Sequence, residues 1–307
     1  MNQETVSIVM ASFNGEKYLK EQMDSLLSQT YENIRIEVCD DGSTDGTEQI
    51  ISEYRKKDER IFFHKNEANK GYVKNFLEGI KRAEGRYIML CDQDDIWNID
   101  KVENTLLLMK KEEKKYPSKP ILVFTDAVLY DSETECTTGL FHENSHLDTK
   151  KVDTAHLFME NKVIGCTAMV NRNILPYLEE IPREVRVHDW WLALICSHFG
   201  RIVYDRNPTL LYRQHSGNQI GGSSFLQYVK DRISSVQRQR EALRASYRQG
   251  EIFLQMFGDR MTQEQLEIAE AFAGMEDAGW LKRRRYMLKY GFEKSGVVRN
   301  IGLFLLI

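Results

Sequence analysis

Short apolar runs alternate with helix-like stretches over the first part of the chain. Four runs have the length and composition of buried strands: Val6–Met10, Ile34–Cys39, Ile61–His64 and Tyr87–Cys91. Between them, apolar residues recur at helical spacing, at Tyr18, Leu19, Met23, Leu26 and Leu27, at Ile50, Ile51 and Tyr54, and within Gly71–Ala83. Asn14 is suited to cap the first of these helices. This alternation predicts parallel strands joined by right-handed crossovers, with ligands bound at the carboxyl ends of the strands.

The middle of the chain continues the pattern less regularly. Pro120–Thr125 predicts another strand with Asp126 at its end, and Leu129–Glu143 resembles a hairpin rich in Thr, Ser and Glu. Gly165–Val170 is a small, apolar segment that suits a strand. His188–Trp191 then opens a helix that continues from Leu192 to Phe199. These elements extend the predicted α/β domain by a second half.

After Phe225 the pattern changes to long helices. Seven apolar residues recur at helical intervals: Phe225, Val229, Ile233, Val236, Leu243, Tyr247 and Leu254. Thr262 is placed to cap a further helix, Gln263–Met275, and the chain ends with the basic run Lys282–Arg285 and the apolar segment Gly302–Ile307. Because apolar stripes must be buried, we expect these helices to dock on the chain itself or to form a homo-oligomer. Peripheral contact with an anionic membrane is the alternative.

Composition narrows the possible classes. The chain has 307 residues, of which 42% are hydrophobic, which suits a large α/β domain with an appendage. A formal net charge of −4 argues against a general nucleic-acid binder. Five cysteines without a Cys-x-x-Cys pair indicate reduced thiols and a cytoplasmic protein. The first residues do not resemble a secretory signal, and no apolar run approaches the roughly 18 residues of a membrane span.

Acidic residues follow two of the predicted strands. Asp92, Gln93, Asp94 and Asp95 come directly after the strand Tyr87–Cys91, and their carboxylates would repel one another unless a cation lay among them. Carboxylates two positions apart suit Mg²⁺ or Mn²⁺, although a solvated acidic turn has the same pattern. A second acidic turn, Asp40–Gly46, ends another strand. Neither a Gly-x-Gly-x-x-Gly turn after the first strand nor a Walker motif is present, so a nucleotide diphosphate carried with its cation fits better than a nicotinamide cofactor.

Four segments resemble, in order and spacing, the family 2 glycosyltransferases with the GT-A fold: Ser7–Asn14, Asp40–Thr47, Asn69–Gly71 and Asp92–Asp95. The resemblance covers roughly residues 5–220. It implies a Rossmann-like, mostly parallel sheet flanked by helices in residues 1–222, with a nucleotide-sugar half at about 1–100 and an acceptor half at about 101–222. Residues 223–307 would form a C-terminal helical region.

The resemblance also implies donor-binding residues. By position in the family, the base and ribose would be held by Ala11, Ser12, Phe13, Glu16 and Asp40. Asp92 would contact the ribose and Asp94 the metal, with Gln93 also at the nucleotide sugar and Asp95 assisting the metal or facing the donor sugar. Lys70 either reaches the base or phosphates or is an exposed loop lysine.

The family places its catalytic base within a Glu-Asp pair, where this chain has His188 and Asp189. Asp189 is therefore the expected base, although an acidic residue in the first turn of a helix is also ordinary. His188 departs from the family pattern, and we expect it either to pack or to hydrogen-bond Asp189. Trp190 and Trp191 could provide apolar platforms for an acceptor sugar, with His188 beside them. Tyr212–Asn218 resembles the family's closing loop, in which Arg213 would stabilise the leaving diphosphate and His215 would bind the metal.

These features and the resemblance predict a glycosyltransferase that requires Mn²⁺ or Mg²⁺, and the resemblance alone implies that it inverts the anomeric configuration. It would transfer sugar from a UDP- or dTDP-linked donor to a hydroxyl group of a glycan, glycolipid or glycoprotein acceptor in bacterial surface-polysaccharide or glycoprotein synthesis, in the cytoplasm or at the inner face of the cell membrane. His188–Trp191 and Tyr212–His215 are similar to rhamnosyltransferase-like members of the family. The alternatives are a metal-dependent nucleotidyltransferase, which would need a phosphate-binding loop, and a non-catalytic sugar-nucleotide scaffold, which would have no use for His188–Trp191.

Overall fold

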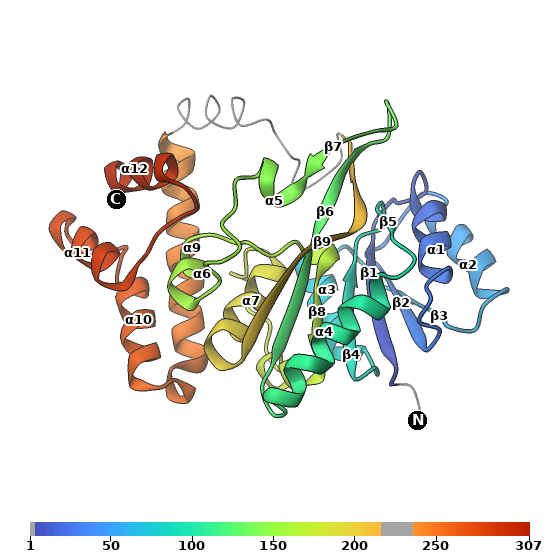
Figure 1. The fold of residues 1–307 in the computed structure, drawn as a ribbon, viewed down its shortest axis with the longest axis horizontal. Helices are drawn as coiled ribbons and strands as arrows, with labels where there is room; N and C mark the ends of the chain where they lie inside the picture. The colour runs from blue at the N-terminus through green and yellow to red at the C-terminus, as the bar shows by residue number, and fades with distance from the viewer. Residues whose placement is uncertain (1–3, 216–235) are drawn as a thin grey trace.

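A nine-stranded mixed sheet is at the centre of the residues that the computed structural model describes, 4–215 and 236–307 (Figure 1). The strands run in the order β3-β2-β1-β4-β8-β6-β9-β5, and β7 pairs with β6. Their bounds are β1 Val6–Ser12, β2 Ile34–Asp40, β3 Ile61–Lys65, β4 Tyr87–Cys91, β5 Ile96–Trp97, β6 Ile121–Asp131, β7 Cys136–Leu140, β8 Met169–Asn171 and β9 Arg201–Gln214.

The first half of the sheet is parallel, as the strand and helix alternation predicts. β1 pairs in parallel with both β2 and β4, and β2 pairs in parallel with β3. Four helices belong to this half: α1 Leu19–Leu27, α2 Thr47–Arg55, α3 Tyr72–Arg82 and α4 Lys101–Lys115. Alternate residues of β1 face opposite layers, since Ile8 packs with residues of α1, α2 and α4 whereas Val9 packs with residues of α3. The predicted βα organisation is confirmed here.

The second half of the sheet departs from the expected strand ends. β8 lies between β4 and β6 and is antiparallel to both. The strand predicted to end at Thr125 continues to Asp131, so Asp126 lies inside β6, at an irregularity in its pairing with β9, and not at a strand terminus. The segment predicted as one strand, Gly165–Val170, divides into the 3₁₀ helix η1 (Gly165–Thr167) and β8.

The remaining helices cover the second half and the C-terminal region. They are α5 Phe141–Asn144, α6 Thr154–Met159, α7 His188–Phe199, α9 Val236–Phe257, α10 Gln263–Ala273, α11 Trp280–Tyr290 and α12 Val297–Leu306, with the 3₁₀ helices η2 Arg172–Tyr177 and η3 Gly258–Arg260. Thr262 caps α10 through a reciprocal pair of hydrogen bonds with Gln265, as its position predicts. In the described part of the chain, no helix is long and apolar enough to cross a membrane.

The C-terminal helices dock on the α/β domain. Phe253 of α9 lies in the same core cluster as Phe158 of α6 and Trp191 of α7, with edge contacts between its ring and both of theirs. Leu243 and Tyr247, two residues of the predicted apolar stripe, are buried in this interface. Phe225, Val229 and Ile233 and the expected boundary at 222/223 lie outside the described residues.

Candidate active site

The loops after β1 and β4 are joined by a side-chain amide. The Phe13 backbone N–H donates to Gln93 Oε1 at 2.9 Å, and Gln93 Nε2 donates to the Phe13 carbonyl at 3.1 Å. Gly15 allows this approach, because a Cβ there would lie 2.2 Å from Gln93 Oε1. The Phe13 side chain remains 46% exposed. Gln93 therefore holds the first loop against the acidic loop of Asp92–Asp95.

Asp40 lies beneath the first loop and not on its surface. Its side chain is fully buried, and it accepts hydrogen bonds from Ser12 Oγ at 3.1 Å and from the Ser43 backbone N–H at 2.9 Å. Ser12 is buried as well, whereas Ala11 is half-buried. Asp40 and Ser12 thus fix the shape of the two strand ends that the sequence assigns to base and ribose binding.

Asp41 organises the loop at Asn69–Gly71, a role that the sequence did not reveal. Its carboxylate accepts from the backbone N–H groups of Lys70 and Gly71 at 2.8 and 2.9 Å. The Lys70 ammonium lies 2.8 Å from Glu78 Oε2. This ion pair favours the second expectation for Lys70, a loop lysine at the surface. In the sequence, only the position of Asp41 directly after Asp40 at a strand end indicated that it could have such a role.

Asn14 and Glu16 bind the second turn instead of the helix that follows them. Asn14 has a left-handed backbone (φ 50°), and its Oδ1 accepts from the Thr44 backbone N–H at 2.9 Å. The expected cap at Asn14 is therefore wrong, because α1 begins at Leu19 and the Asn14 side chain is used by another loop. Glu16 Oε2 accepts from the Gly46 backbone N–H at 2.9 Å.

The acidic loop concentrates carboxylates where β4 ends. Asp95 is buried, and its Oδ1 accepts from the Arg213 backbone N–H at 3.2 Å, while the Cys166 thiol is a further partner of its carboxylate. Burial, and then the charge of Asp94, raises the pKa of Asp95 to about 7. Burial, followed by the charges of Asp95 and Asp94, also raises the pKa of Asp92 well above its ordinary value. Buried carboxylates that repel one another would be stabilised by a bound cation.

Two sets of residues in this loop could hold a cation. Asp94 Oδ2 lies 2.8 Å from His215 Nε2, and the His215 ring stacks on Tyr18 with a centroid distance of 4.8 Å. Ligand atoms of Asp92, Asp95 and Cys166 lie within 4.8 Å of one another. Burial raises the pKa of the Cys166 thiol well above its usual value, and hard cations prefer oxygen ligands. Asp94 and His215 thus offer a cation one carboxylate and one imidazole, whereas Asp92 and Asp95 offer two carboxylates.

Arg213 attaches β9 to the acidic loop. Its Nε donates to the Asp94 carbonyl at 2.7 Å, and its guanidinium forms an ion pair with Glu21 and lies 4.7 Å from the centroid of the Tyr18 ring. The side chain is almost fully buried. Its contacts position the expected metal ligand. The rest of the closing loop, residues 216–218, lies outside the described residues.

Asp189 lies in the first turn of α7, facing the acidic loop. It is buried, and its Oδ1 accepts from Asn161 Nδ2 at 2.9 Å and from the Trp190 backbone N–H at 2.6 Å. Burial raises its pKa to about 7, and its charge contributes to the raised pKa of Asp92. Burial first, then the charges of Asp189 and Asp92, raise the pKa of Tyr72. Asn161 and Tyr72 carried no signal in the sequence, because a loop asparagine and a helical tyrosine are ordinary.

His188 packs and does not hydrogen-bond Asp189. Its ring stacks on Phe76 with a centroid distance of 4.0 Å, and neither ring nitrogen has a hydrogen-bond partner among the described residues. Burial lowers its pKa to about 3, so the imidazole is neutral. Of the two expectations for this residue, the structure supports packing.

Neither tryptophan forms an open platform for an acceptor. Trp191 is fully buried between Phe253 and Phe257 of α9, so the expectation for this residue is wrong. Trp190 is 5% exposed, its indole N–H donates to the Leu157 carbonyl, and the Arg186 guanidinium lies 4.8 Å from its ring centroid. Both indoles instead belong to the core cluster that α7 shares with α9.

The segment that carries Asn161 is held by the C-terminal region. Glu160 accepts from the Ser295 backbone N–H at 2.8 Å and from the Arg299 guanidinium at 2.9 Å. The buried Lys162 ammonium donates to Ser295 Oγ at 3.2 Å. Residues on both sides of Asn161 are thus held by Ser295, in the loop between α11 and α12, and by Arg299 in α12.

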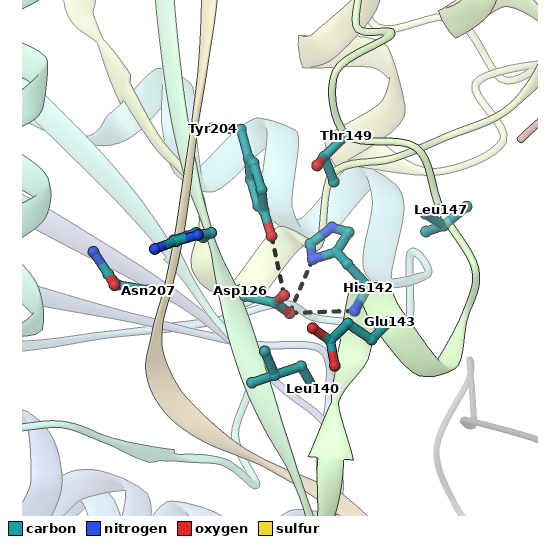
Figure 2. Close-up of a pocket in the computed structure, with 9 residues that line it drawn as sticks. Asp126, Leu140, His142, Glu143, Leu147, Thr149, Tyr204 and Asn207 are labelled. Atoms are coloured by element: carbon teal, nitrogen blue, oxygen red, sulfur yellow. Dashed lines mark hydrogen bonds and ion pairs between the residues drawn. The ribbon is translucent and has the colours of Figure 1, made fainter.

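A pocket of about 360 Å³ lies between β6, β9 and the segment after β7 (Figure 2). At its base, Asp126 Oδ1 lies 2.9 Å from His142 Nδ1, and Asp126 Oδ2 accepts from the Tyr204 hydroxyl at 3.0 Å. His142 Nε2 lies 2.9 Å from the Lys162 carbonyl, one residue beyond Asn161. The pocket therefore borders the segment that supports Asp189.

Comparison with known proteins identifies the architecture. Residues 7–175 match the model of the family described as "Glycosyl transferase family 2". The dTDP-rhamnosyl transferase RfbG of Shigella flexneri is 30% identical over 227 residues, which cover 70% of this chain and 74% of that protein. The UDP-Glc:alpha-D-GlcNAc-diphosphoundecaprenol beta-1,3-glucosyltransferase WfaP of Escherichia coli is 28% identical over 231 residues, 74% of this chain and 84% of that protein.

Solved structures share the fold at low sequence identity. S. aureus TarS 1-349 in complex with UDP-GlcNAc has a TM-score of 0.59 and 15% identity, covering 93% of this chain and 73% of that one. The mannosyltransferase PcManGT of Pyrobaculum calidifontis in complex with GDP-Man and Mn²⁺ has a TM-score of 0.53 and 13% identity, covering 99% and 79%. The predicted GT-A fold class is confirmed.

Proposed function

The chain belongs to glycosyl transferase family 2, and we propose that it transfers a sugar from a nucleotide-diphosphate sugar to a hydroxyl group of a bacterial surface glycan, with inversion at the anomeric carbon. The observation that carries this proposal is the position of Asp189, a buried carboxylate with a pKa of about 7 whose charge influences the acidic loop. A base with its pKa near neutrality is suited to accept a proton from a hydroxyl group.

The loops at the ends of β1, β2 and β4 form the donor site in this proposal. Phe13 is exposed and, with Ala11, contacts the base, while Asp92 contacts the ribose. The buried or bonded residues Ser12, Glu16, Asp40, Lys70 and Gln93 keep these loops in place. The names of the relatives favour a UDP- or dTDP-linked hexose or deoxyhexose.

In the proposed reaction, Asp189 accepts the proton of the acceptor hydroxyl as that oxygen attacks the anomeric carbon. The bond from this carbon to the diphosphate breaks on the opposite face, so one displacement inverts the configuration. Asp94 and His215 would hold Mn²⁺ or Mg²⁺, which when bound offsets the charge developing on the diphosphate. Arg213 keeps Asp94 in position through the Asp94 carbonyl.

The acceptor is proposed to be a sugar hydroxyl on a lipid-linked or polymeric glycan. Support comes from the relatives, one of which is named for a diphosphoundecaprenol-linked acceptor. A glycoprotein acceptor is the other possibility consistent with the same chemistry.

The test is nucleoside diphosphate release from a panel of UDP- and dTDP-sugars with Mn²⁺, with and without lipid-linked acceptors. We expect slow release without acceptor, stimulated by the correct acceptor, and Asp189→Asn should reduce transfer by about 10²–10⁴-fold while leaving donor binding intact. Asp259→Asn, at an exposed position in η3, is the matched control. Donor binding without release would instead identify a scaffold, and transfer by Asp189→Asn at the parent rate would refute the assignment of the base.

A further inference from the structure

Large apolar side chains are concentrated on the outer surface of the last two helices. Eight of the eleven exposed large hydrophobic residues in the described part of the chain belong to α11 and α12: Trp280, Leu281, Leu288, Val297, Val298, Ile301, Phe304 and Leu305. The other three are separated along the chain, at Phe13, Ile99 and Leu107. We call the eight residues, together with Lys282, Arg285 and Lys289, the α11–α12 surface. Exposed apolar side chains that are concentrated on neighbouring elements in this way indicate an interaction site.

The apolar residues of α12 share one face. Val297, Val298, Ile301 and Leu305 recur at i, i+1, i+4 and i+8, and their exposed fractions run from 57% to 76%. Leu303, on the opposite face, is 3% exposed and packs on the protein. α12 therefore has one apolar face that the protein covers and another that it leaves open.

Basic residues flank the apolar ones on α11. Lys282, Arg285 and Lys289 are exposed at i, i+3 and i+7, so they form one side of the helix next to Leu281 and Leu288. Neither α11 nor α12 contains an acidic residue. An apolar strip bordered by cations matches the acyl and headgroup regions of an anionic lipid surface.

The two helices are held as one surface by Arg284. Its guanidinium donates to the carbonyls of Phe304 and Ile307, both at 2.6 Å, and to the Trp280 carbonyl at 3.1 Å. Figure 1 shows α11 and α12 at the end of the molecule opposite α2 and β3. Both helices therefore lie at a distance from the first half of the sheet and from the ends of its strands.

We propose that the α11–α12 surface binds an anionic lipid bilayer peripherally. The competing occupant is a second copy of the chain. In a twofold dimer the same patch meets itself, so Lys282, Arg285 and Lys289 would approach their own copies, and like charges disfavour that contact. Anionic headgroups are complementary to the same three cations. This inference does not depend on the proposed transferase activity.

The test is flotation of the full-length protein with vesicles of phosphatidylcholine alone or mixed with phosphatidylglycerol, at low and high salt. We expect binding to the mixed vesicles that weakens as salt is added. Lys282→Gln, Arg285→Gln and Lys289→Gln should each weaken binding about fivefold. Ile301→Ser with Leu305→Ser should abolish it.

The matched control is Ile99→Ser with Leu107→Ser, which removes side chains that are 58% and 62% exposed outside the surface and should not alter flotation. Thermal unfolding shows whether each variant is folded. If the variant with Ile301→Ser and Leu305→Ser unfolds at a lower temperature than the parent, the three single charge variants test the proposal instead. Failure of the parent protein to float with anionic vesicles would overturn the proposal. So would light scattering that shows a dimer dissociated by the same substitutions, because a second copy would then cover the surface.

Discussion

Removal of the Asn161 amide should shift the pH dependence of transfer in a predictable direction. Asn161 Nδ2 donates to Asp189 Oδ1 at 2.9 Å, so it stabilises the charged form of a carboxyl group whose pKa burial already raises to about 7. A hydrogen bond to a charged group contributes about 1.5–3 kcal/mol. Since about 1.4 kcal/mol corresponds to one pH unit, Asn161→Ala should raise the pKa of Asp189 to about 8–9.

The proposed base must be deprotonated to act, so activity is lost as the pH falls through the pKa of Asp189. At pH 7 the deprotonated fraction would decrease from about half to roughly a tenth or a hundredth, a reduction in rate of roughly 5- to 50-fold. At pH values above the new pKa the rate should recover to the parent plateau. The assay is kcat/KM for sugar transfer measured across pH, with donor KM followed separately.

Two further variants test whether the lost hydrogen bond to Asp189 causes the predicted shift in the pH profile. Asn161→Asp keeps the size of the side chain and can still accept from the Val163 backbone N–H, but it places a second carboxylate beside Asp189 and should raise the pKa further. Asn173→Ala removes an amide that donates to the carbonyls of Pro117 and Lys119, and it should leave the profile unchanged. An Asn161→Ala profile that is lower at every pH but has an unmoved acidic limb would refute this reasoning.

Three other outcomes are expected. Asp94→Ala, or EDTA added to the parent protein, should abolish transfer, and Mn²⁺ titration should show weaker binding to the variant; full turnover in EDTA would contradict the metal assignment. Gly165→Ala should lower kcat, because its Cβ would lie 2.7 Å from His188 Nε2 and 3.4 Å from Asp189 Oδ2. An unchanged kcat would show that the His188 side chain can move away without displacing Asp189. Trp191→Ala should cost about 3–5 kcal/mol of unfolding free energy, measured with urea, whereas Leu288→Ala at a 79% exposed site should change it by less than about 0.5 kcal/mol.

The parallel half of the fold could be predicted because its signals are local. Each of its strands is a short apolar run, and Leu19, Met23 and Leu26 recur at helical spacing and are buried as expected. The bounds of β6 were not predictable, because Asp126 is an acidic residue that the structure accommodates inside a strand through His142 and Tyr204. Those partners are distant in sequence.

Within the candidate site, residue types were more predictable than their contacts. The sequence places Asp92, Asp94 and Asp95 at the end of β4, and the structure adds that Gln93 and Arg213 hold this loop. Trp191 was misplaced because an indole packs equally well on a sugar or in a core, and only the docking of α9 decides between them. Asn161 depends on a tertiary contact that no spacing encodes.

The contacts from Ser295 and Arg299 to the residues on either side of Asn161 bear on how members of this family could be recombined. The matched family region ends at residue 175, so the helices after β9 look like an exchangeable module. In this chain the C-terminal helices are not such a module, since Glu160 would lose its hydrogen bonds from Ser295 and Arg299 if another terminus replaced residues 295–299. A chimera that retains the α/β domain would therefore need the segment 148–162 to be exchanged together with its own C-terminus. The helices that we propose to bind lipid and the segment that supports the proposed base would then be inherited as a unit.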